Sequence, residues 1–121
     1  MAGKEQHSMT VVSSTLPQGI GLIEVAGSLL GGEEIEQLRS AVSEFVDREQ
    51  SRLIIDVTGV TYLNSSAVGV LISALIAYMR QGWKIKLCGV SKAVYSILAI
   101  TKLNLIFDRY DTREEAILSF R

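Results

Sequence analysis

A chain of 121 residues has the length of one domain, and its 48% hydrophobic and 21% charged residues are typical of a protein with a folded core. Its 12 basic and 13 acidic residues nearly cancel, which argues against nucleic acid or an anionic membrane surface as the partner. The longest apolar run, residues 67–77, is too short to span a membrane, so we expect no direct membrane insertion and a protein as the partner.

The start of the chain and its single cysteine indicate where the domain lies and in which compartment it works. Residues 1–8 are polar and hold the only histidine, His7, so we expect a flexible tail or expression remnant there and one domain over residues 9–121. No signal-peptide pattern opens the chain, and Cys88 has no second cysteine with which to form a disulfide. We therefore expect a cytoplasmic protein with Cys88 as a buried structural thiol.

The first elements are a hairpin and a surface helix. Residues 9–16 and 20–26 are predicted to pair as strands, because residues 17–19 between them supply turn chemistry. Residues 31–32 are both glycine and are expected to be a flexible lead-in to a helix over residues 33–49, whose apolar residues recur on one face.

A buried strand and a second helix follow. Residues 53–57 form a short continuous apolar run rich in β-branched residues, which predicts a central parallel strand covered on both faces. Residues 66–81 are apolar nearly all round and are followed by Gly82. This helix is therefore either deeply buried or offers its spare face to a partner.

The remaining elements complete an α/β pattern. Residues 84–88 alternate as a strand, Ser91 can cap a helix that runs to about residue 102, and residues 105–107 can form a last short strand.

Residues 112–115 have the form of a capping box for a terminal helix, with Ala116, Ile117 and Phe120 facing inward. The order β-β-α-β-α-β-α-β-α predicts one α/β domain. We expect a mixed, mostly parallel sheet with helices packed on it and an antiparallel edge hairpin.

The sequence lacks the residue patterns of common catalytic sites. With its only histidine in the expected tail, a Ser-His-Asp hydrolase is not predicted. Neither Ser65 nor Ser66 has the flanking glycines of a nucleophile elbow, and no glycine-rich phosphate loop ending in Gly-Lys-Ser/Thr occurs. One cysteine and one histidine provide no cluster of metal ligands. We expect a protein that is not an enzyme and uses no metal or cofactor.

Asp56 is near the end of the predicted buried strand, where response-regulator receiver domains carry their phosphoacceptor aspartate. Those domains also have an acidic pair after the first strand, and here residues 16–17 and 26–27, which end the first strands, include no acid. The receiver interpretation is therefore rejected. Asp56 is expected to accept hydrogen bonds from backbone amides of a turn at residues 58–59.

Asn64, Ser65 and Ser66 stand at the joint between the predicted strand and the second helix. Asparagine or serine oxygens can accept from the unpaired first amides of a helix, so capping is one interpretation. A phosphorylation site is the other, since the positive end of a helix tolerates phosphate. The added charge would then repel a partner surface that fitted the bare hydroxyl.

Residues 53–71, LIIDVTGVTYLNSSAVGVL, resemble the signature of STAS domains, and more narrowly that of bacterial anti-sigma-factor antagonists. The pattern of those antagonists is a strand ending in Asp, a Ser/Thr-Gly-Val turn and then Asp-Ser-Ser-Gly entering a helix. The similarity continues at residues 89–91 and 101–103, and the predicted order of elements matches that fold from about Met9 to the C terminus.

The resemblance implies a partner-switching regulator of transcription. In that family, the unphosphorylated antagonist binds a serine-kinase anti-sigma factor with a histidine-kinase-like ATPase fold and frees the sigma factor. Phosphorylation of the first serine weakens binding, and a phosphoserine phosphatase resets the protein. Mapped onto this sequence, the phosphoacceptor is Ser65, and the partner-binding loop includes Asp56, Asn64, Ser66 and Ala67 together with the exposed part of the helix.

Two positions depart from the family pattern: Asn64 stands where Asp is usual, and Ala67 stands where Gly is usual. Asparagine keeps an acceptor for capping but removes a negative charge beside the target hydroxyl, which can alter kinase recognition. Ala67 favours a helix that begins tightly at the serines. The alternative function is a STAS module that binds a transporter ATPase complex or a signalling assembly without phosphorylation, with Ser65 and Ser66 only as helix caps.

Overall fold

The computed structural model describes residues 10–29 and 32–121. Its elements follow the predicted order, with one short 3-10 helix added before the last strand. The elements are β1 Thr10–Thr15, β2 Gly21–Leu29, α1 Gly32–Asp47, β3 Arg52–Leu63, α2 Ser65–Arg80, β4 Lys84–Cys88, α3 Lys92–Ile100, η2 Leu103–Leu105, β5 Asp108–Tyr110 and α4 Arg113–Leu118. The expected tail over residues 1–8 lies outside the described residues. So does Gly31 of the expected flexible lead-in, while Gly32 is the first residue of α1.

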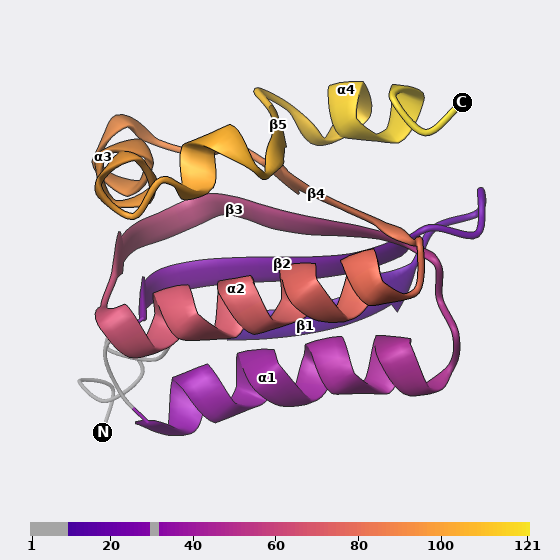
Figure 1. Cartoon of the computed structure of the whole chain (residues 1–121), viewed down its shortest axis with the longest axis horizontal. Helices are drawn as coiled ribbons and strands as arrows, with labels where there is room; N and C mark the ends of the chain where they lie inside the picture. Colours follow the sequence, from indigo (N-terminus) through magenta and orange to yellow (C-terminus); the bar gives the residue numbers. More distant parts are fainter. Residues whose placement is uncertain (1–9, 30–31) are drawn as a thin grey trace, which may run out of the picture.

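The five strands lie in the order β1-β2-β3-β4-β5. β1 is antiparallel to β2, and every other neighbouring pair is parallel. Helices α1 and α2 lie side by side on one face of this sheet, and α4 lies on the other (Figure 1). The predicted α/β domain with a mixed sheet and an antiparallel edge is confirmed.

The hairpin between β1 and β2 closes through a three-residue turn. The amide of Leu16 donates to the carbonyl of Ile20 at 2.8 Å, and the amide of Gly19 donates to the carbonyl of Leu16 at 2.9 Å. Gly19 has φ +77°, a left-handed conformation that glycine adopts without steric cost. The glycine at the end of the predicted turn is therefore required by the backbone.

β3 is longer than predicted, because it continues through residues 58–63 to Leu63. The turn predicted at Thr58-Gly59 is wrong, because both residues lie within β3. Opposite this point, Glu24 pairs with Asp56 and Ala26 pairs with Gly59, so β3 has one more residue than β2 between the two pairs. This β-bulge accommodates the extra residue of β3 without ending the strand.

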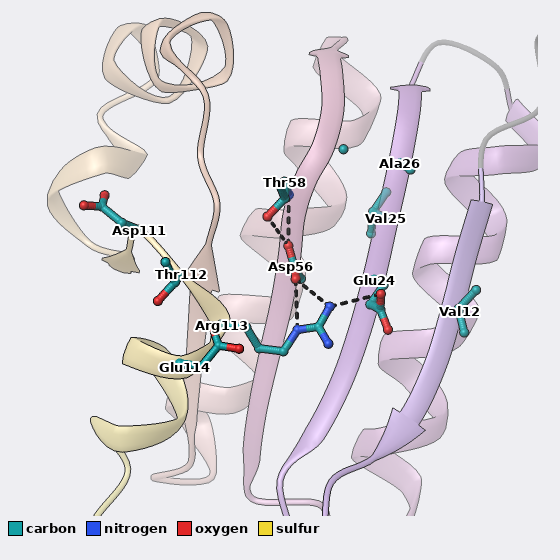
Figure 2. Close-up of a pocket in the computed structure, with 11 residues that line it drawn as sticks. Val12, Glu24, Val25, Ala26, Asp56, Thr58, Asp111, Thr112, Arg113 and Glu114 are labelled. Carbon is teal, nitrogen blue, oxygen red and sulfur yellow. Dashed lines mark hydrogen bonds and ion pairs between the residues drawn. The ribbon is translucent and has the colours of Figure 1, made fainter.

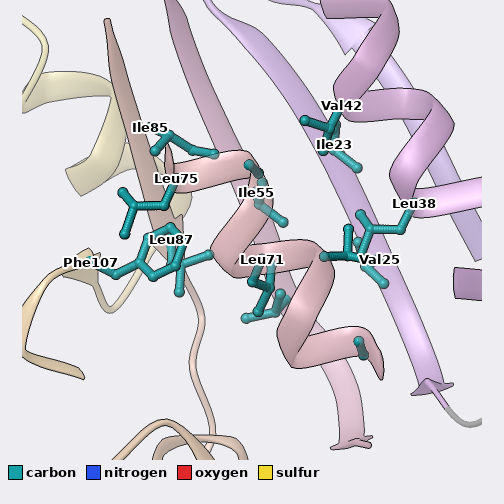
Figure 3. Packing of buried hydrophobic residues seen from close by; sticks show 14 of the residues in the cluster. Ile23, Val25, Leu38, Val42, Ile55, Leu71, Leu75, Ile85, Leu87 and Phe107 are labelled. Atoms are coloured by element: carbon teal, nitrogen blue, oxygen red, sulfur yellow. The ribbon is translucent and has the colours of Figure 1, made fainter. Parts of the chain in front are cut away.

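Alternate residues of the central strands supply two cores, one on each face of the sheet. Ile23, Ile55 and Leu87 belong to the large core under α1 and α2, whereas Leu22, Ile54 and Cys88 belong to the smaller core under α4. Figure 3 shows Leu71 and Leu75 of α2 over the strands that carry Ile55, Ile85 and Leu87. The expectation of a central strand covered on both faces is confirmed for β3, and Cys88 is buried as predicted.

The segment before the last strand differs from its prediction. Residues 105–107 were expected to be a strand, but residues 103–105 form η2 and the strand β5 begins at Asp108. Leu103 and Phe107 are buried in the large core, while Leu105 and Ile106 are exposed. Apolar residues four apart that share one buried side suit a helical turn rather than a strand.

Short α4 is held on the sheet by capping and by a buried cation. The hydroxyl of Thr112 accepts from the amide of Glu115 at 3.1 Å, so the predicted N-cap is confirmed. Lys86 of β4 is buried, donates to the hydroxyl of Ser119 at 2.8 Å and lies 4.4 Å from the ring centroid of Phe120. The aliphatic part of the lysine thus packs in the small core while its charge is met by a hydroxyl and an aromatic face.

Candidate functional site at the start of α2

Asn64 is the residue that caps α2. Its backbone is extended, with φ −90° and ψ −179°, and its side-chain oxygen accepts from the amide of Ala67 at 2.9 Å. The interpretation of Ser65 and Ser66 as the helix caps is therefore wrong, because they are the first two residues of the helix itself. The departure from aspartate to asparagine keeps the cap, since an amide oxygen accepts this hydrogen bond as a carboxylate does.

Ser65 and Ser66 present their side chains to solvent in the first turn of α2, whereas Ala67 is fully buried. The first amides of a helix have no intrahelical acceptor, and the helix dipole places partial positive charge at this end. The first turn of α2 contains no acidic residue. A phosphate on either serine would therefore meet a favourable field from its own chain.

The exposed side of α2 is largely apolar and begins at Ser65. At 3.6 residues per turn, one stripe of this helix contains Ser65, Gly69, Ile72, Ile76 and Met79. Ile76 is 44% exposed and Met79 is 64% exposed, while Ile72 is partly buried. The helix was predicted to be either deeply buried or to leave an apolar face open, and the structure shows the open face. We call these five residues the α2 stripe.

Ser66 stands apart from the α2 stripe. It lies about 100° around the helix from Ser65, on a side that it shares with Ser73. Ser65 is in line with Ile72 and Ile76, so a group added to it would stand at the end of the apolar surface. The two serines are thus distinguished by their place on the helix and not by their exposure.

Asp56 is not brought together with the serines. Its side chain leaves β3 on the face covered by α4, whereas its neighbours Ile55 and Val57 face the core under α2. The amide and hydroxyl of Thr58 donate to Asp56 Oδ1 at 3.0 and 2.6 Å. The Asp56 carboxylate was predicted to accept from backbone amides, and this is confirmed for the amide of Thr58. Thr58 lies within the strand β3 and not in a turn.

Arg113 is the partner of Asp56 that sequence reasoning missed. Its Nε and Nη2 atoms donate to Asp56 Oδ2 at 3.1 and 2.9 Å, and Nη2 also lies 3.0 Å from Glu24 Oε1 (Figure 2). The three charges line a cavity of about 500 Å³ on the face of the sheet that α4 leaves partly open. The capping box at Thr112 placed Arg113 at the start of a helix, but no pattern in the sequence links it to a residue 57 positions earlier.

The charges around Asp56 shift several pKa values. Burial by itself would raise the pKa of Asp56, but hydrogen bonds from Thr58 and Arg113 outweigh it and the net shift is downward. The hydrogen bond to Asp56 raises the pKa of Arg113 further above its usual value. Burial, followed by the charge of Asp56, raises the pKa of Cys88 to about 12. The carboxylate and guanidinium are therefore both charged at neutral pH, while the thiol is protonated and unreactive.

The described residues contain no group of three or more His, Cys, Asp or Glu side chains placed to hold a metal ion. None of the helices in this part of the chain combines the length and apolar character needed to cross a membrane.

The sequence pattern of the STAS domain matches residues 12–116 of this chain. The chain belongs to the STAS domain family. An anti-sigma-factor antagonist (STAS) domain protein from Planctomyces limnophilus is 26% identical, with a TM-score of 0.75 over 90% of this chain and 96% of the other.

Two further solved structures share the fold. The phosphorylated form of the Bacillus cell fate determinant SpoIIAA is 18% identical, with a TM-score of 0.76 over 93% of this chain and 100% of that protein. A sulfate transporter family protein from Wolinella succinogenes is 15% identical, with a TM-score of 0.70 over 88% of each chain. At 18% and 15% identity, these two likenesses show a shared fold.

Proposed function

We propose that this STAS domain is an anti-sigma-factor antagonist that binds a serine-kinase anti-sigma factor when unphosphorylated and is released when Ser65 is phosphorylated. One observation carries the proposal: the exposed hydroxyl of Ser65 lies at the amino-terminal end of the exposed apolar α2 stripe. The same surface can then hold a partner and be modified by it.

The physical basis of the switch is a difference between the free and the bound protein. In the free protein, a phosphate on Ser65 is accepted by the amides and dipole of α2. In a complex, its charge of about −1.5 to −2 would stand against a surface fitted to Ile72 and Ile76, where desolvation is costly. Phosphorylation therefore leaves the fold intact and weakens binding, by about a hundredfold for about 2.7 kcal/mol of lost interaction.

We further propose that the domain acts in the cytoplasm, has no catalytic activity of its own, and is reset by a phosphoserine phosphatase. The support for a role without catalysis is the shortage of convergent catalytic groups among residues 10–29 and 32–121. The charged cluster of Asp56, Arg113 and Glu24 is internally paired and lies on the other face of the sheet.

The proposal is tested by incubating the protein with ATP and a serine-kinase anti-sigma factor from the same organism, followed by intact-mass measurement. We expect one phosphate on the wild type and on Ser66→Ala, and none on Ser65→Ala. Ser66→Ala is the matched control because Ser66 is also exposed but lies off the α2 stripe. Binding of the kinase to Ser65→Asp should be at least about tenfold weaker than to Ser65→Ala, because a carboxylate carries part of the phosphate charge.

Two outcomes would contradict the proposal. A phosphate found on a residue other than Ser65 would reject the site, and equal kinase affinity for Ser65→Asp and Ser65→Ala would reject charge as the switch. Asn64→Asp separates recognition from folding. The aspartate of this variant can still cap α2, so the fold should be unchanged. A change in the phosphorylation rate would therefore show that the kinase recognises the negative charge beside Ser65.

A role in a transporter or signalling assembly is the second candidate, favoured by the likeness to the Wolinella sulfate transporter family protein. In that case the α2 stripe would still bind a partner, but Ser65 would not be modified. Recovery of transporter subunits and no kinase by the tagged wild-type protein, with binding lost in Ile76→Asp and no phosphate found on Ser65, would favour this second function.

A further inference from the structure

The outer side of β1 lacks the features that usually protect an edge strand. β1 is the edge of the described sheet, opposite β5. Thr10–Thr15 reads TVVSST, with no charged residue and no proline, and its pairing with β2 runs without a bulge. Edge strands commonly carry such features, because an open row of backbone groups is a template for another strand.

The register of the hairpin shows which backbone groups of β1 face outward. Leu16 and Ile20 form a hydrogen-bonded pair at the turn. Hydrogen-bonded and non-hydrogen-bonded pairs alternate along an antiparallel ladder, so the pairs of Val11 and Ser13 with β2 are of the non-hydrogen-bonded kind. Their N–H and C=O groups therefore point away from β2, toward the open edge.

A groove with an acidic wall runs beside these backbone groups. It has a volume of about 400 Å³ and lies between β1 and α1, which runs alongside β1 and β2 at this edge (Figure 1). Val11 and Ser13 line it from the strand. The α1 side chains that line it are Glu33, Glu36, Gln37, Ser40, Ala41 and Glu44, and none of the lysines or arginines in the described part of the chain does.

The acidic wall keeps most of its charge available to a partner. Glu36 and Glu44 pair with Arg39 at 3.2 Å and Arg48 at 3.7 Å, but all four side chains are more than half exposed. Exposed pairs of this kind contribute little, so their carboxylates can exchange partners at low cost. Glu33 has no such ion pair among the described residues.

The opposite face of β1 carries the apolar side chain of Val12 next to Ser14, beside the cavity that Glu24 and Arg113 line. Val12 points away from the groove, because side chains alternate along a strand, and it is 47% exposed. A strand added to β1 would therefore meet carboxylates on one face and Val12 on the other. The matching sequence alternates basic and apolar residues.

We propose that the edge of β1 binds an extended basic segment of a partner protein, which adds to the sheet as a strand and directs its basic side chains into the acidic groove. Main-chain hydrogen bonds to Val11 and Ser13 supply affinity, and the alternation of basic and apolar side chains supplies selectivity. This surface is separate from the α2 stripe, so the antagonist carries a second docking site that phosphorylation of Ser65 does not cover.

Charge also argues against a second copy of this chain as the occupant. Antiparallel pairing of two β1 strands would place the two α1 helices next to each other on the same face of a continuous sheet. The groove-lining glutamates of one copy would then face those of the other. Like charges placed directly opposite are destabilising, whereas a basic segment is attracted.

The experiment titrates the full chain with the labelled peptide Lys-Val-Lys-Val-Lys-Val and follows anisotropy and backbone amide shifts. We expect saturable binding that weakens with added salt, and the largest shifts at Val11 and Ser13. Ser13→Pro removes an outward N–H while sparing the ladder to β2, and Glu44→Lys reverses a charge in the groove. Each should weaken binding by about three- to tenfold. Asp108→Lys is the matched reversal on the opposite edge strand and should leave binding unchanged.

Several results would overturn this inference. They are no binding at millimolar peptide, equal binding of Lys-Lys-Lys-Val-Val-Val or of Glu-Val-Glu-Val-Glu-Val, or amide shifts centred on the α2 stripe. A dimer in sedimentation that Ser13→Pro dissociates would make a second copy the occupant. None of these outcomes involves Ser65 or a kinase, so the docking site and the phosphorylation switch can fail independently.

Discussion

Asp56 is the residue whose chemistry depends most on its neighbours. A carboxylate at the centre of a sheet is expensive to bury unless it is paired and hydrogen-bonded. Here Thr58 supplies two hydrogen bonds and Arg113 supplies two more, so the charge is fully satisfied. The pair therefore fixes the start of α4 on the sheet, and its strength should be measurable as pH-dependent stability.

The first prediction concerns that pH dependence. Because the pKa of Asp56 is lowered in the folded state, its contribution to stability is present above the unfolded pKa and is lost as pH falls below about 4. Arg113→Met removes the cation and should lower the free energy of unfolding at pH 7 by about 1–2 kcal/mol, between the values for exposed and buried pairs. The difference between variant and wild type should shrink in acid, as followed by urea unfolding at several pH values.

Arg39→Met is the matched control for Arg113→Met. It breaks an ion pair of Arg39 with Glu36 in which both side chains are more than half exposed. Its cost should be below about 0.5 kcal/mol. If Arg113→Met costs no more than this at pH 7, Asp56 is stabilised by Thr58 alone.

At the scale of elements, the joint between β4 and α3 depends on a close approach of two backbones. Gly89 follows β4 with φ +75°, and its amide donates to the carbonyl of Tyr110 at 3.0 Å. A Cβ atom on Gly89 would collide with the Thr58 hydroxyl and lie 2.9 Å from the Thr58 Cα. That hydroxyl is the one that donates to Asp56, so the joint and the charged cluster share an atom.

The second prediction compares two glycines with nearly equal φ. Gly82 has φ +74°, and a Cβ added there would meet no other atom within 4 Å, whereas a Cβ added at Gly89 would collide with Thr58. Gly82→Ala should cost about 1 kcal/mol, from the left-handed backbone alone. Gly89→Ala should cost at least about 2 kcal/mol more, because Thr58 must move and Asp56 loses a hydrogen bond. Urea unfolding of both variants measures the difference, and equal costs would mean that β3 and β4 separate easily at this point.

At the scale of the whole molecule, α4 and the sheet enclose a thiol. Cys88 is fully buried in the small core with Leu22, Ile54 and Ala116, and burial together with Asp56 raises its pKa to about 12. A reagent can reach this thiol only when α4 leaves the sheet or the domain unfolds. Its reactivity therefore reports how tightly the two layers hold together.

The third prediction is that native Cys88 is protected from disulfide reagents. Its reaction with 5,5′-dithiobis(2-nitrobenzoic acid) at pH 8 should be about a thousandfold slower or more in buffer than in denaturant, as expected for a domain of ordinary stability. Arg113→Met should accelerate the reaction, because it weakens the attachment of α4. A native rate within tenfold of the unfolded rate would mean that α4 opens locally and often.

The fold was largely predictable from local patterns, and the site only in part. The hairpin turn, the cap of the terminal helix and the apolar run of β3 are set by nearby residues, so the sequence alone predicts them. The predictions for residues 58–63 and residues 105–107 were wrong, because pairing with β2 and burial of Phe107 decide the conformation there. Tertiary contacts override local preference at such positions.

By itself, the sequence determined the order of elements, the family resemblance and the position of Ser65 at the start of an apolar helix, because these depend on periodicity and capping over a few residues. Only the tertiary structure decided which side of α2 stays open, that Arg113 pairs with Asp56, and that the edge of β1 lies beside an acidic groove. Each of these joins groups that are distant in the chain. Their contacts arise from how the layers pack, and no local pattern of residues encodes them.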